Sequence, residues 1–321
     1  MRVLVTGANG FVGQWVCRAM ADAGIAVRGT VRRTDVPQRL PNGFALNDRV
    51  VVGEIVDGMD WGAALHGVDA IVHLAARVHV MRERARDPLE AFRAVNVHAT
   101  ACLARAAAAC GVRRFVYVSS VKVHGERTTT HPFTEYDAPH PEDVYAQSKR
   151  EAEQVLEDIA AMTGLELAIV RPPLVYGPSV RGNFFALLRA INRGIPLPFG
   201  STVNERSMIS VRNLADVLLR CVTHPRAVGQ QFLVRDAESV GTRELINRIA
   251  AVLGSRPRLW PFPRALLAGF AWMVGKHATL RRLTDSLVVD GAHVRAALGW
   301  TPPVTMEEEL RATAAWYREI L

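Results

Sequence analysis

The sequence predicts an α/β protein: a Rossmann-type, doubly wound parallel sheet followed by a smaller C-terminal α/β domain. Three observations predict it. Short apolar segments alternate with helical ones in the first half, a glycine-rich motif follows the first apolar segment, and prolines cluster after residue 170. Strands and helices in alternation form right-handed crossovers and a parallel sheet covered on both faces. We expect a first domain at 1–170 and a second at 171–321, with segments such as 208–234 returning to the first.

The expected strands are short and rich in valine and isoleucine. They cover residues 3–6, 26–31, 50–53, 70–75, 115–119 and 166–170, and residues 231–234 are expected to join the sheet edge. The expected helices cover residues 11–23, 61–66, 88–110 and 144–162. Gly111 and Gly164 follow the last two helices, and glycine is the residue that most often ends a helix.

The composition is that of an ordinary soluble globular protein. The chain has 321 residues, of which 49% are hydrophobic and 22% charged,. Its net charge of +8 is shared equally by the two halves, so no basic tail or stripe indicates nucleic-acid binding,. The four cysteines form no C-x-x-C pair, which favours a reducing compartment and argues against a thiolate metal site,. We predict no metal site.

The sequence contains no segment typical of a stable membrane insertion. The N-terminal residues lead directly into glycines and lack the apolar stretch of a signal peptide,. The most apolar run, residues 265–275, is shorter than the roughly 18 residues that a bilayer crossing needs,. We expect a cytoplasmic protein in which this run is a buried helix or lid; peripheral membrane contact is the alternative.

The motif TGANGFVG at residues 6–13 lies between the first expected strand and helix. Glycine at the first position permits a tight turn, at the second lets a diphosphate approach the backbone, and at the third lets helix and strand pack closely. The helix N-terminus then offers free N–H groups to phosphate. The sequence therefore predicts a dinucleotide site, with contacts from Gly7, Asn9, Gly10, Phe11 and Val12.

The tip of the second strand distinguishes NAD from NADP. An acidic residue there would accept hydrogen bonds from the 2′-hydroxyl of NAD, but the strand ends in Arg32 and Arg33,. A guanidinium suits a 2′-phosphate, so NADP(H) is favoured over NAD(H), although the nearby Asp35 weakens this preference. Glu54 and Ile55, after the third strand, are expected at the adenine edge.

Tyr145 and Lys149 are the central candidates for catalysis. Residues four apart share one face of a helix, so the phenol and the ammonium face the same space. A nearby cation lowers the pKa of tyrosine, which could then exchange a proton with a substrate hydroxyl or ketone during hydride transfer. Only three of the 39 basic residues are lysine, so its presence here is informative. Ser120, after the fifth strand, could hydrogen-bond the reacting oxygen.

With these elements in order, the chain resembles the extended short-chain dehydrogenase/reductases, specifically the nucleotide-sugar epimerase, dehydratase and reductase group. The resemblance covers nearly the whole chain. It is carried by TGANGFVG (6–13), HLAA (73–76), VSSVKVHG (118–125), YAQSK (145–149) and RPPLVYGP (171–178). It implies a catalytic triad of Ser120, Tyr145 and Lys149, supported by Asn96.

The resemblance also implies the binding residues. Lys149 and Tyr145 would contact the nicotinamide ribose as well as the substrate, and the second domain would hold a nucleotide sugar, most often UDP-linked. Additional cofactor contacts would come from Leu74, Ala75, Ala76, Asn96 and Pro172. For the substrate, the family likeness places Asn183 and Phe184 near the diphosphate, Phe199 beside the base and Arg206 on a phosphate, together with Ser120.

Departures from the family pattern narrow the reaction. Sugar-nucleotide dehydratases carry an Asp-Glu pair directly after the catalytic hydroxyl residue, and here these positions are Val121 and Lys122. Loss of water is therefore not expected. Leu174 replaces an asparagine whose amide commonly touches substrate in the family. His124 replaces a tyrosine and is expected to make a local packing or polar contact.

Three functions remain open at this point. The segments 115–126 and 260–290 resemble bacterial NADPH-dependent reductases of UDP-4-keto-6-deoxy-N-acetylhexosamines, which serve surface-polysaccharide synthesis, and this is the favoured reaction. A UDP-hexose or UDP-N-acetylhexosamine 4-epimerase with tightly bound NAD is the alternative. A non-catalytic dinucleotide sensor is the third, although the triad is complete. The resemblance also suggests a homodimer through the helices at 88–110 and 144–162.

Overall fold

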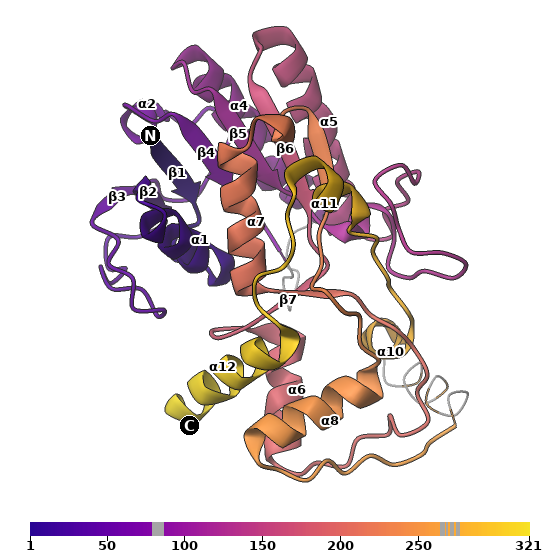
Figure 1. The fold of residues 1–321 in the computed structure, drawn as a ribbon. Helices are drawn as coiled ribbons and strands as arrows, with labels where there is room; N and C mark the ends of the chain where they lie inside the picture. The colour runs from indigo at the N-terminus through magenta and orange to yellow at the C-terminus, as the bar shows by residue number, and fades with distance from the viewer. Residues whose placement is uncertain (79–86, 264–266, 268, 270–272, 274–276) are drawn as a thin grey trace.

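The computed structural model describes residues 1–78, 87–263 and 277–321, together with residues 267, 269 and 273. Among them, seven parallel strands form one sheet in the order β3-β2-β1-β4-β5-β6-β9 (Figure 1). The strands are β1 (Arg2–Thr6), β2 (Ala26–Val31), β3 (Asp48–Val51), β4 (Ala70–His73), β5 (Arg114–Val118), β6 (Glu166–Arg171) and β9 (Gln230–Leu233). The predicted doubly wound parallel sheet is confirmed. The order in which strands are added reverses between β1 and β4, and open α/β sheets bind ligands at such a point,.

Helices cover both faces of this sheet, as its apolar strands require. One face is covered by α1 (Phe11–Asp22), α7 (Val211–Thr223) and α11 (Ala292–Leu298), which share a core with β1 and β6. The other is covered by α2 (Gly62–Leu65), α4 (Ala99–Ala109) and α5 (Val144–Thr163). Gly111 and Gly164 follow α4 and α5 with φ of +75° and +76°, the left-handed conformation expected of helix-ending glycines,.

The helix expected at 88–110 is present, but it contains a π-helical turn that the sequence did not predict. It comprises α3 (Pro88–Arg93), a π-helical turn at Ala94–His98 and α4. The π-turn carries Asn96, whose side chain is buried and hydrogen-bonded to a loop and to α5. Irregular turns of this kind often occur at functional sites. The expected strands at 70–75 and 115–119 end earlier, at His73 and Val118, because the following residues leave the sheet to form its carboxyl edge.

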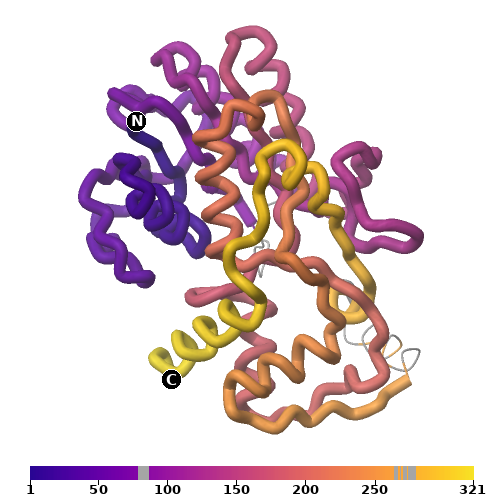
Figure 2. The backbone as a smooth tube through the Cα atoms, viewed as in Figure 1, coloured from indigo at the N-terminus to yellow at the C-terminus, as the bar shows by residue number. Residues whose placement is uncertain are grey.

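The chain after residue 171 builds a smaller unit below the sheet edge (Figures 1 and 2). The two strands β7 (Leu174–Tyr176) and β8 (Met208–Ser210) pair in parallel. Helices α6 (Gly182–Asn192), α8 (Thr242–Leu253) and α12 (Met306–Glu319) pack around their own apolar core. The helix α10 (His277–Thr284) lies at one side of this unit. The 208–234 segment returns to the first unit, where β9 forms an edge of the large sheet and α7 covers one of its faces.

Two sequence expectations remain open here. Most of the apolar run at 265–275 lies outside the described residues. No described helix combines the length and apolar character needed to cross a bilayer. The helices expected to form a dimer are the α3–α4 segment and α5, which pack side by side on one face of the sheet. Dimerisation through them stays a prediction.

Substitution of Gly13 by alanine tests the packing of the first turn. A Cβ at this position would lie 2.1 Å from the carbonyl oxygen of Gly7 and 2.9 Å from Cα of Ala8. Both are backbone atoms, so the strain should lower the free energy of unfolding by about 1–3 kcal/mol and weaken dinucleotide binding. Urea denaturation measures the first effect, and cofactor titration measures the second.

Gly291→Ala is the matched control, because its added Cβ would meet only the Arg235 side chain at an ordinary 3.6 Å. Equal losses of stability in the two variants would contradict the packing argument.

Candidate active site

The phosphate loop has the geometry of a diphosphate cradle. Gly7 adopts φ of +67°, and a Cβ there would contact the backbone of Ala75 at 3.5 Å. The loop is tied to β2, since Gly7 N donates to Thr30 Oγ1 at 3.3 Å and Ala8 N to the Thr30 carbonyl at 3.2 Å. Gly10 precedes α1 without a side-chain cap. The first N–H groups of the helix are thus left for a phosphate, so these residues fit a dinucleotide.

A buried hydrogen-bond relay fixes this loop against β4, and sequence reasoning missed it. The Thr6 hydroxyl accepts from the N–H groups of Leu74 and Ala75 at 3.0 and 3.1 Å, so its own proton goes to His73 Nδ1 at 2.8 Å,. His73 Nε2 then donates to Thr100 Oγ1 at 3.0 Å. Burial lowers the pKa of His73 to about 3, with a smaller contribution from Lys149. The neutral ring is a positioning group, and its place in the HLAA motif was the available signal.

The two arginines at the tip of β2 are both solvent-exposed. Arg33 lies 3.0 Å from Asp35, so part of its charge is already compensated. Arg32 has an exposed side chain at the strand end, Glu54 is exposed beyond β3, and Ile55 packs partly against the core. Arg28, in contrast, holds Asp48 and the carbonyl groups at the end of α2. The cofactor contacts expected of Arg32, Arg33, Glu54 and Ile55 remain predictions.

The structure brings Ser120 and Tyr145 together. Ser120 follows β5 and caps the short 3-10 helix η2 (Val121–Val123), while Tyr145 is the second residue of α5. The Tyr145 phenol is hydrogen-bonded to Ser120, and its ring packs edge-on against Phe92 with centroids 6.3 Å apart. Both hydroxyl groups therefore lie at the carboxyl edge of the sheet, in the arrangement needed to hold one substrate oxygen.

The expected effect of Lys149 on Tyr145 is wrong for the protein alone. Burial, followed by the charge of Asp143, raises the pKa of Tyr145 to about 12, against a smaller lowering by the Ser120 bond. The Lys149 ammonium instead donates to the Val118 carbonyl at 2.6 Å and lies 4.1 Å from the Tyr117 ring centroid. At neutral pH Tyr145 is therefore protonated and can act as a general acid.

The environment of Lys149 also changes its own charge state. Only 2% of the residue is exposed, and this burial lowers its pKa to about 7, while Glu153 one turn later acts in the opposite direction. Lysines whose pKa is lowered this far by burial cluster at functional sites,.

Asn96 connects the π-turn to the same helix. Its Nδ2 donates to Ser148 Oγ at 2.9 Å and to the Arg77 carbonyl at 3.0 Å, and its Oδ1 accepts from Arg77 N at 2.7 Å. Ser148 Oγ in turn donates to the Tyr145 carbonyl at 2.8 Å. Asn96 thus supports the first turn of α5, and a direct contact with cofactor remains a prediction.

A buried ion pair lies directly beneath the site. Arg171 donates two hydrogen bonds to Glu153, at 2.9 and 2.7 Å, and a third to His124 Nε2 at 3.0 Å. His124 also stacks on Phe133, so the expected local packing and polar contact is confirmed. Burial lowers its pKa to about 4. The Arg171–Glu153 pair was not predicted, although Arg171 begins the RPPLVYGP motif.

The predicted substrate residues of the second domain have different environments. Asn183 is exposed at the start of α6, and Arg206 donates to the Asp285 carbonyl at 2.8 Å. Phe184 and Phe199 are buried in the core of this domain, and Phe184 packs on Tyr176. Their rings serve the core, so a contact with ligand would come from their backbone. Pro172 is buried, and its carbonyl accepts a hydrogen bond from Val121 N at 3.0 Å.

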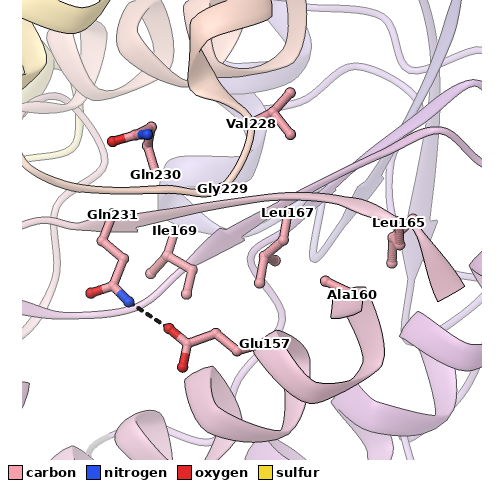
Figure 3. A pocket seen from close by; sticks show the side chains of 9 residues that line it. All are labelled: Glu157, Ala160, Leu165, Leu167, Ile169, Val228, Gly229, Gln230 and Gln231. Atoms are coloured by element: carbon pink, nitrogen blue, oxygen red, sulfur yellow. Dashed lines mark hydrogen bonds between the residues drawn. The ribbon is translucent and has the colours of Figure 1, made fainter. Parts of the chain in front are cut away.

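A separate hollow of about 190 Å³ lies between α5 and the edge of the sheet (Figure 3). Its lining is mainly apolar, with Leu167 and Ile169 of β6 facing Ala160, and Gln231 hydrogen-bonded to Glu157 at 2.5 Å. Because it includes the starts of β6 and β9, it extends away from the carboxyl edge that carries Ser120. Within the described chain, no cluster of three His, Cys, Asp or Glu side chains is arranged to hold a metal ion.

Comparisons with known proteins agree with this geometry. Residues 3–234 match the model of the NAD dependent epimerase/dehydratase family. The chain belongs to this family. UDP-glucose 4-epimerase of Vibrio cholerae is 39% identical over 315 residues, covering 97% of this chain and 94% of that protein. The resemblance to extended short-chain dehydrogenase/reductases is confirmed.

Solved structures share the fold. UDP-glucose 4-epimerase from Thermotoga maritima, solved with UDP-glucose, matches with a TM-score of 0.79 at 21% identity, covering 100% of this chain and 99% of the other. UDP-glucuronic acid 4-epimerase from Bacillus cereus, solved with NAD, matches with a TM-score of 0.80 at 18% identity, covering 100% and 97%.

The buried Lys149 predicts a pH-dependent stability. Its pKa is about 7 in the folded chain against 10.5 ordinarily, so between these values the unfolded chain binds more protons and stability rises with pH,. Lys149→Met removes this dependence. We expect the variant's stability relative to wild type to be highest at or below pH 7 and to decline steadily toward pH 10.

Urea unfolding of both cofactor-free proteins at pH 6, 8 and 10 measures this difference. A gap between them that stays constant with pH would show that the ammonium is not desolvated as described.

Proposed function

We propose that this enzyme interconverts UDP-hexoses that differ at C4, by oxidising the C4 hydroxyl and reducing the resulting ketone from the other face. The observation that carries the proposal is the hydrogen-bonded pair of Ser120 and Tyr145 at the sheet edge. Ser120 is followed in the sequence by Val121 and Lys122 rather than by two acids. The hydrogen-bonded pair can move a proton to and from one oxygen, but no carboxylic acid directly follows Ser120 to eliminate water.

The chain's own residues have distinct roles in this reaction. Ser120 donates to the C4 oxygen. Tyr145 takes the hydroxyl proton as the phenolate, which is the minor form at neutral pH, and returns a proton to the ketone as the phenol,. Lys149, which is 2.6 Å from the Val118 carbonyl, supplies a cation close to that proton transfer. The glycine loop and the N-terminus of α1 would hold the diphosphate of the cofactor, whose nicotinamide would supply the hydride acceptor and donor,.

Two findings favour the 4-epimerase over the reductase that the sequence first suggested. The Vibrio cholerae relative at 39% identity carries the name of a 4-epimerase. In addition, Asp35 compensates Arg33, which weakens the case for a 2′-phosphate site. We therefore propose NAD as the working cofactor and UDP-linked hexose or N-acetylhexosamine as the substrate, with a homodimer as the proposed assembly.

The second candidate is NADPH-dependent reduction of a UDP-4-keto-6-deoxy-N-acetylhexosamine. Arg32 favours it, because an exposed guanidinium at the tip of β2 is available for a 2′-phosphate,. The protonated Tyr145 suits this reaction directly, since it can donate a proton to a ketone without first losing its own,.

The cofactor that remains bound after purification separates these two candidates. An epimerase returns the hydride to its substrate and has no need to release NAD, whereas a reductase exchanges NADP at every turnover. We expect NAD(H) in the purified protein, identified by absorbance and mass spectrometry, and conversion of UDP-glucose or UDP-N-acetylglucosamine to its 4-epimer without added cofactor. NADPH oxidation only with a 4-keto sugar would instead establish the reductase.

Tyr145→Phe tests the role of the phenol. Removal of a general acid and base typically lowers turnover by about 10²–10⁴-fold, while the glycine loop is unchanged and dinucleotide binding should persist. Tyr136→Phe is the matched control, because this tyrosine is 84% exposed and has no role in the proposed reaction.

Turnover of sugar nucleotides is measured by chromatography, and binding by calorimetry. Unchanged turnover in Tyr145→Phe would remove Tyr145 from the mechanism. Dinucleotide binding without turnover in the wild type would favour the non-catalytic sensor.

A further inference from the structure

A cluster of four charged side chains lies beside the catalytic pair, and the proposed reaction does not use it. We define the Lys122 cluster as Lys122, Glu126, Asp143 and Arg282. Lys122 Nζ contacts Glu126 and lies 2.5 Å from Asp143 Oδ2. Arg282 of α10 lies 3.3 Å from Glu126 and 3.9 Å from Asp143. The cluster contains two positive and two negative groups, and all four side chains are at most 30% exposed.

The pair of Lys122 and Asp143 bridges the two segments that carry the catalytic hydroxyls. Lys122 is in the 3-10 turn directly after Ser120, and its N–H donates to Ser120 Oγ at 3.3 Å. Asp143 is the N-cap of α5, where its Oδ1 accepts from Ala146 N at 2.7 Å. Tyr145 follows two residues later. A single ion pair therefore joins the Ser120 turn to the start of the Tyr145 helix.

Further charged side chains lie next to the Lys122 cluster. Glu142 accepts from Glu126 N at 3.1 Å and lies 3.6 Å from Arg281, which also pairs with Asp285 at 3.3 Å. Arg206 donates to the Asp285 backbone at 2.8 Å. On α5 itself, the nearest cation to Tyr145 along the chain is Lys149. The charges that contact Asp143 are thus Lys122 and Arg282. Around them lie Arg206 and Arg281 on the positive side, and Glu126, Glu142 and Asp285 on the negative side.

Asp143 influences Tyr145 electrostatically. Its carboxylate is a cause of the raised pKa of Tyr145, after burial. The Lys122 cation, 2.5 Å from that carboxylate, opposes its field at the phenol, because two opposite charges so close act on a third group partly as a dipole,. Lys122 is the group in the described chain that makes this short contact with Asp143.

We propose that Lys122 is a positioning residue for this active site: paired with Asp143, it fixes the Ser120 turn against the start of α5 and shields Tyr145 from the charge of Asp143. The inference rests on the proposed function, in which Ser120 and Tyr145 share one substrate oxygen. It also explains why a lysine, in a chain with so few, stands two residues after Ser120, where dehydratases carry an acid.

Opposite substitutions within the pair test this proposal. Lys122→Gln leaves Asp143 uncompensated, so the pKa of Tyr145 should rise. Asp143→Asn keeps an N-cap side chain but removes the charge, so the pKa should fall. We expect shifts of about half a pH unit or more in each direction, and a value close to wild type in the double variant.

Two measurements follow these shifts in the NAD⁺-loaded enzyme. The ¹³Cζ resonance of labelled Tyr145, assigned with Tyr145→Phe, reports its titration directly. The pH dependence of epimerisation reports it during turnover, where Lys122→Gln should lower kcat by about tenfold with KM within twofold of wild type, and Lys122→Arg should restore most of kcat.

The matched control is Arg311→Gln, which removes an exposed ion pair with Glu307 on α12 and should leave both readouts unchanged. Shifts in the same direction for Lys122→Gln and Asp143→Asn, or no shift in either, would overturn the proposal. If the wild type epimerises no UDP-sugar but the Tyr145 resonance shifts as expected, the proposed function fails while the role of Lys122 stands.

Discussion

The bond between the Lys149 ammonium and the Val118 carbonyl, 2.6 Å long, is the contact on which the site depends. It attaches α5 to the end of β5, and therefore places Tyr145, one turn earlier on α5, against the hydroxyl of Ser120. Keeping an ammonium in this buried position is unfavourable, because it is removed from water. Around it, Glu153 and Arg171 form an ion pair, and the Tyr117 ring lies against the cation. Lys149 thus joins α5 to β5, next to the ion pair between α5 and β6. Its burial brings its pKa close to neutrality.

The Thr6 hydroxyl is a second contact that positions the site, because it links the glycine loop to the elements that carry the catalytic residues. Thr6 is the last residue of β1, and its hydroxyl accepts the first two N–H groups after β4. The His73 ring passes this connection to Thr100, at the start of α4, close to the π-turn that carries Asn96. Asn96 then supports the first turn of α5 through Ser148. The glycine loop and the tyrosine helix are therefore connected by buried hydrogen bonds, which are costly to break.

Much of this could be predicted from sequence because it depends on local chemistry. Alternating apolar segments predicted the parallel sheet, three glycines predicted the loop, and the four-residue spacing predicted that Tyr145 and Lys149 share a helix. Contacts between distant segments were not accessible in this way. The direction of the Lys149 side chain depends on the carbonyl group of Val118, so its expected effect on Tyr145 was wrong. The partners of His73 and Arg171, and the π-turn at Asn96, likewise become visible only when the segments are packed together.

The central claim is that Ser120, Tyr145 and Lys149 serve oxidation and reduction at C4 of a UDP-hexose. The most direct test is epimerisation of UDP-glucose by the purified protein in D₂O, followed by ¹H NMR of both sugars at equilibrium. The account predicts UDP-galactose that keeps ordinary hydrogen at C4, because the hydride removed from that carbon is returned to it. Deuterium at C4 would instead require exchange of a proton with solvent at that carbon, and would contradict the proposed mechanism.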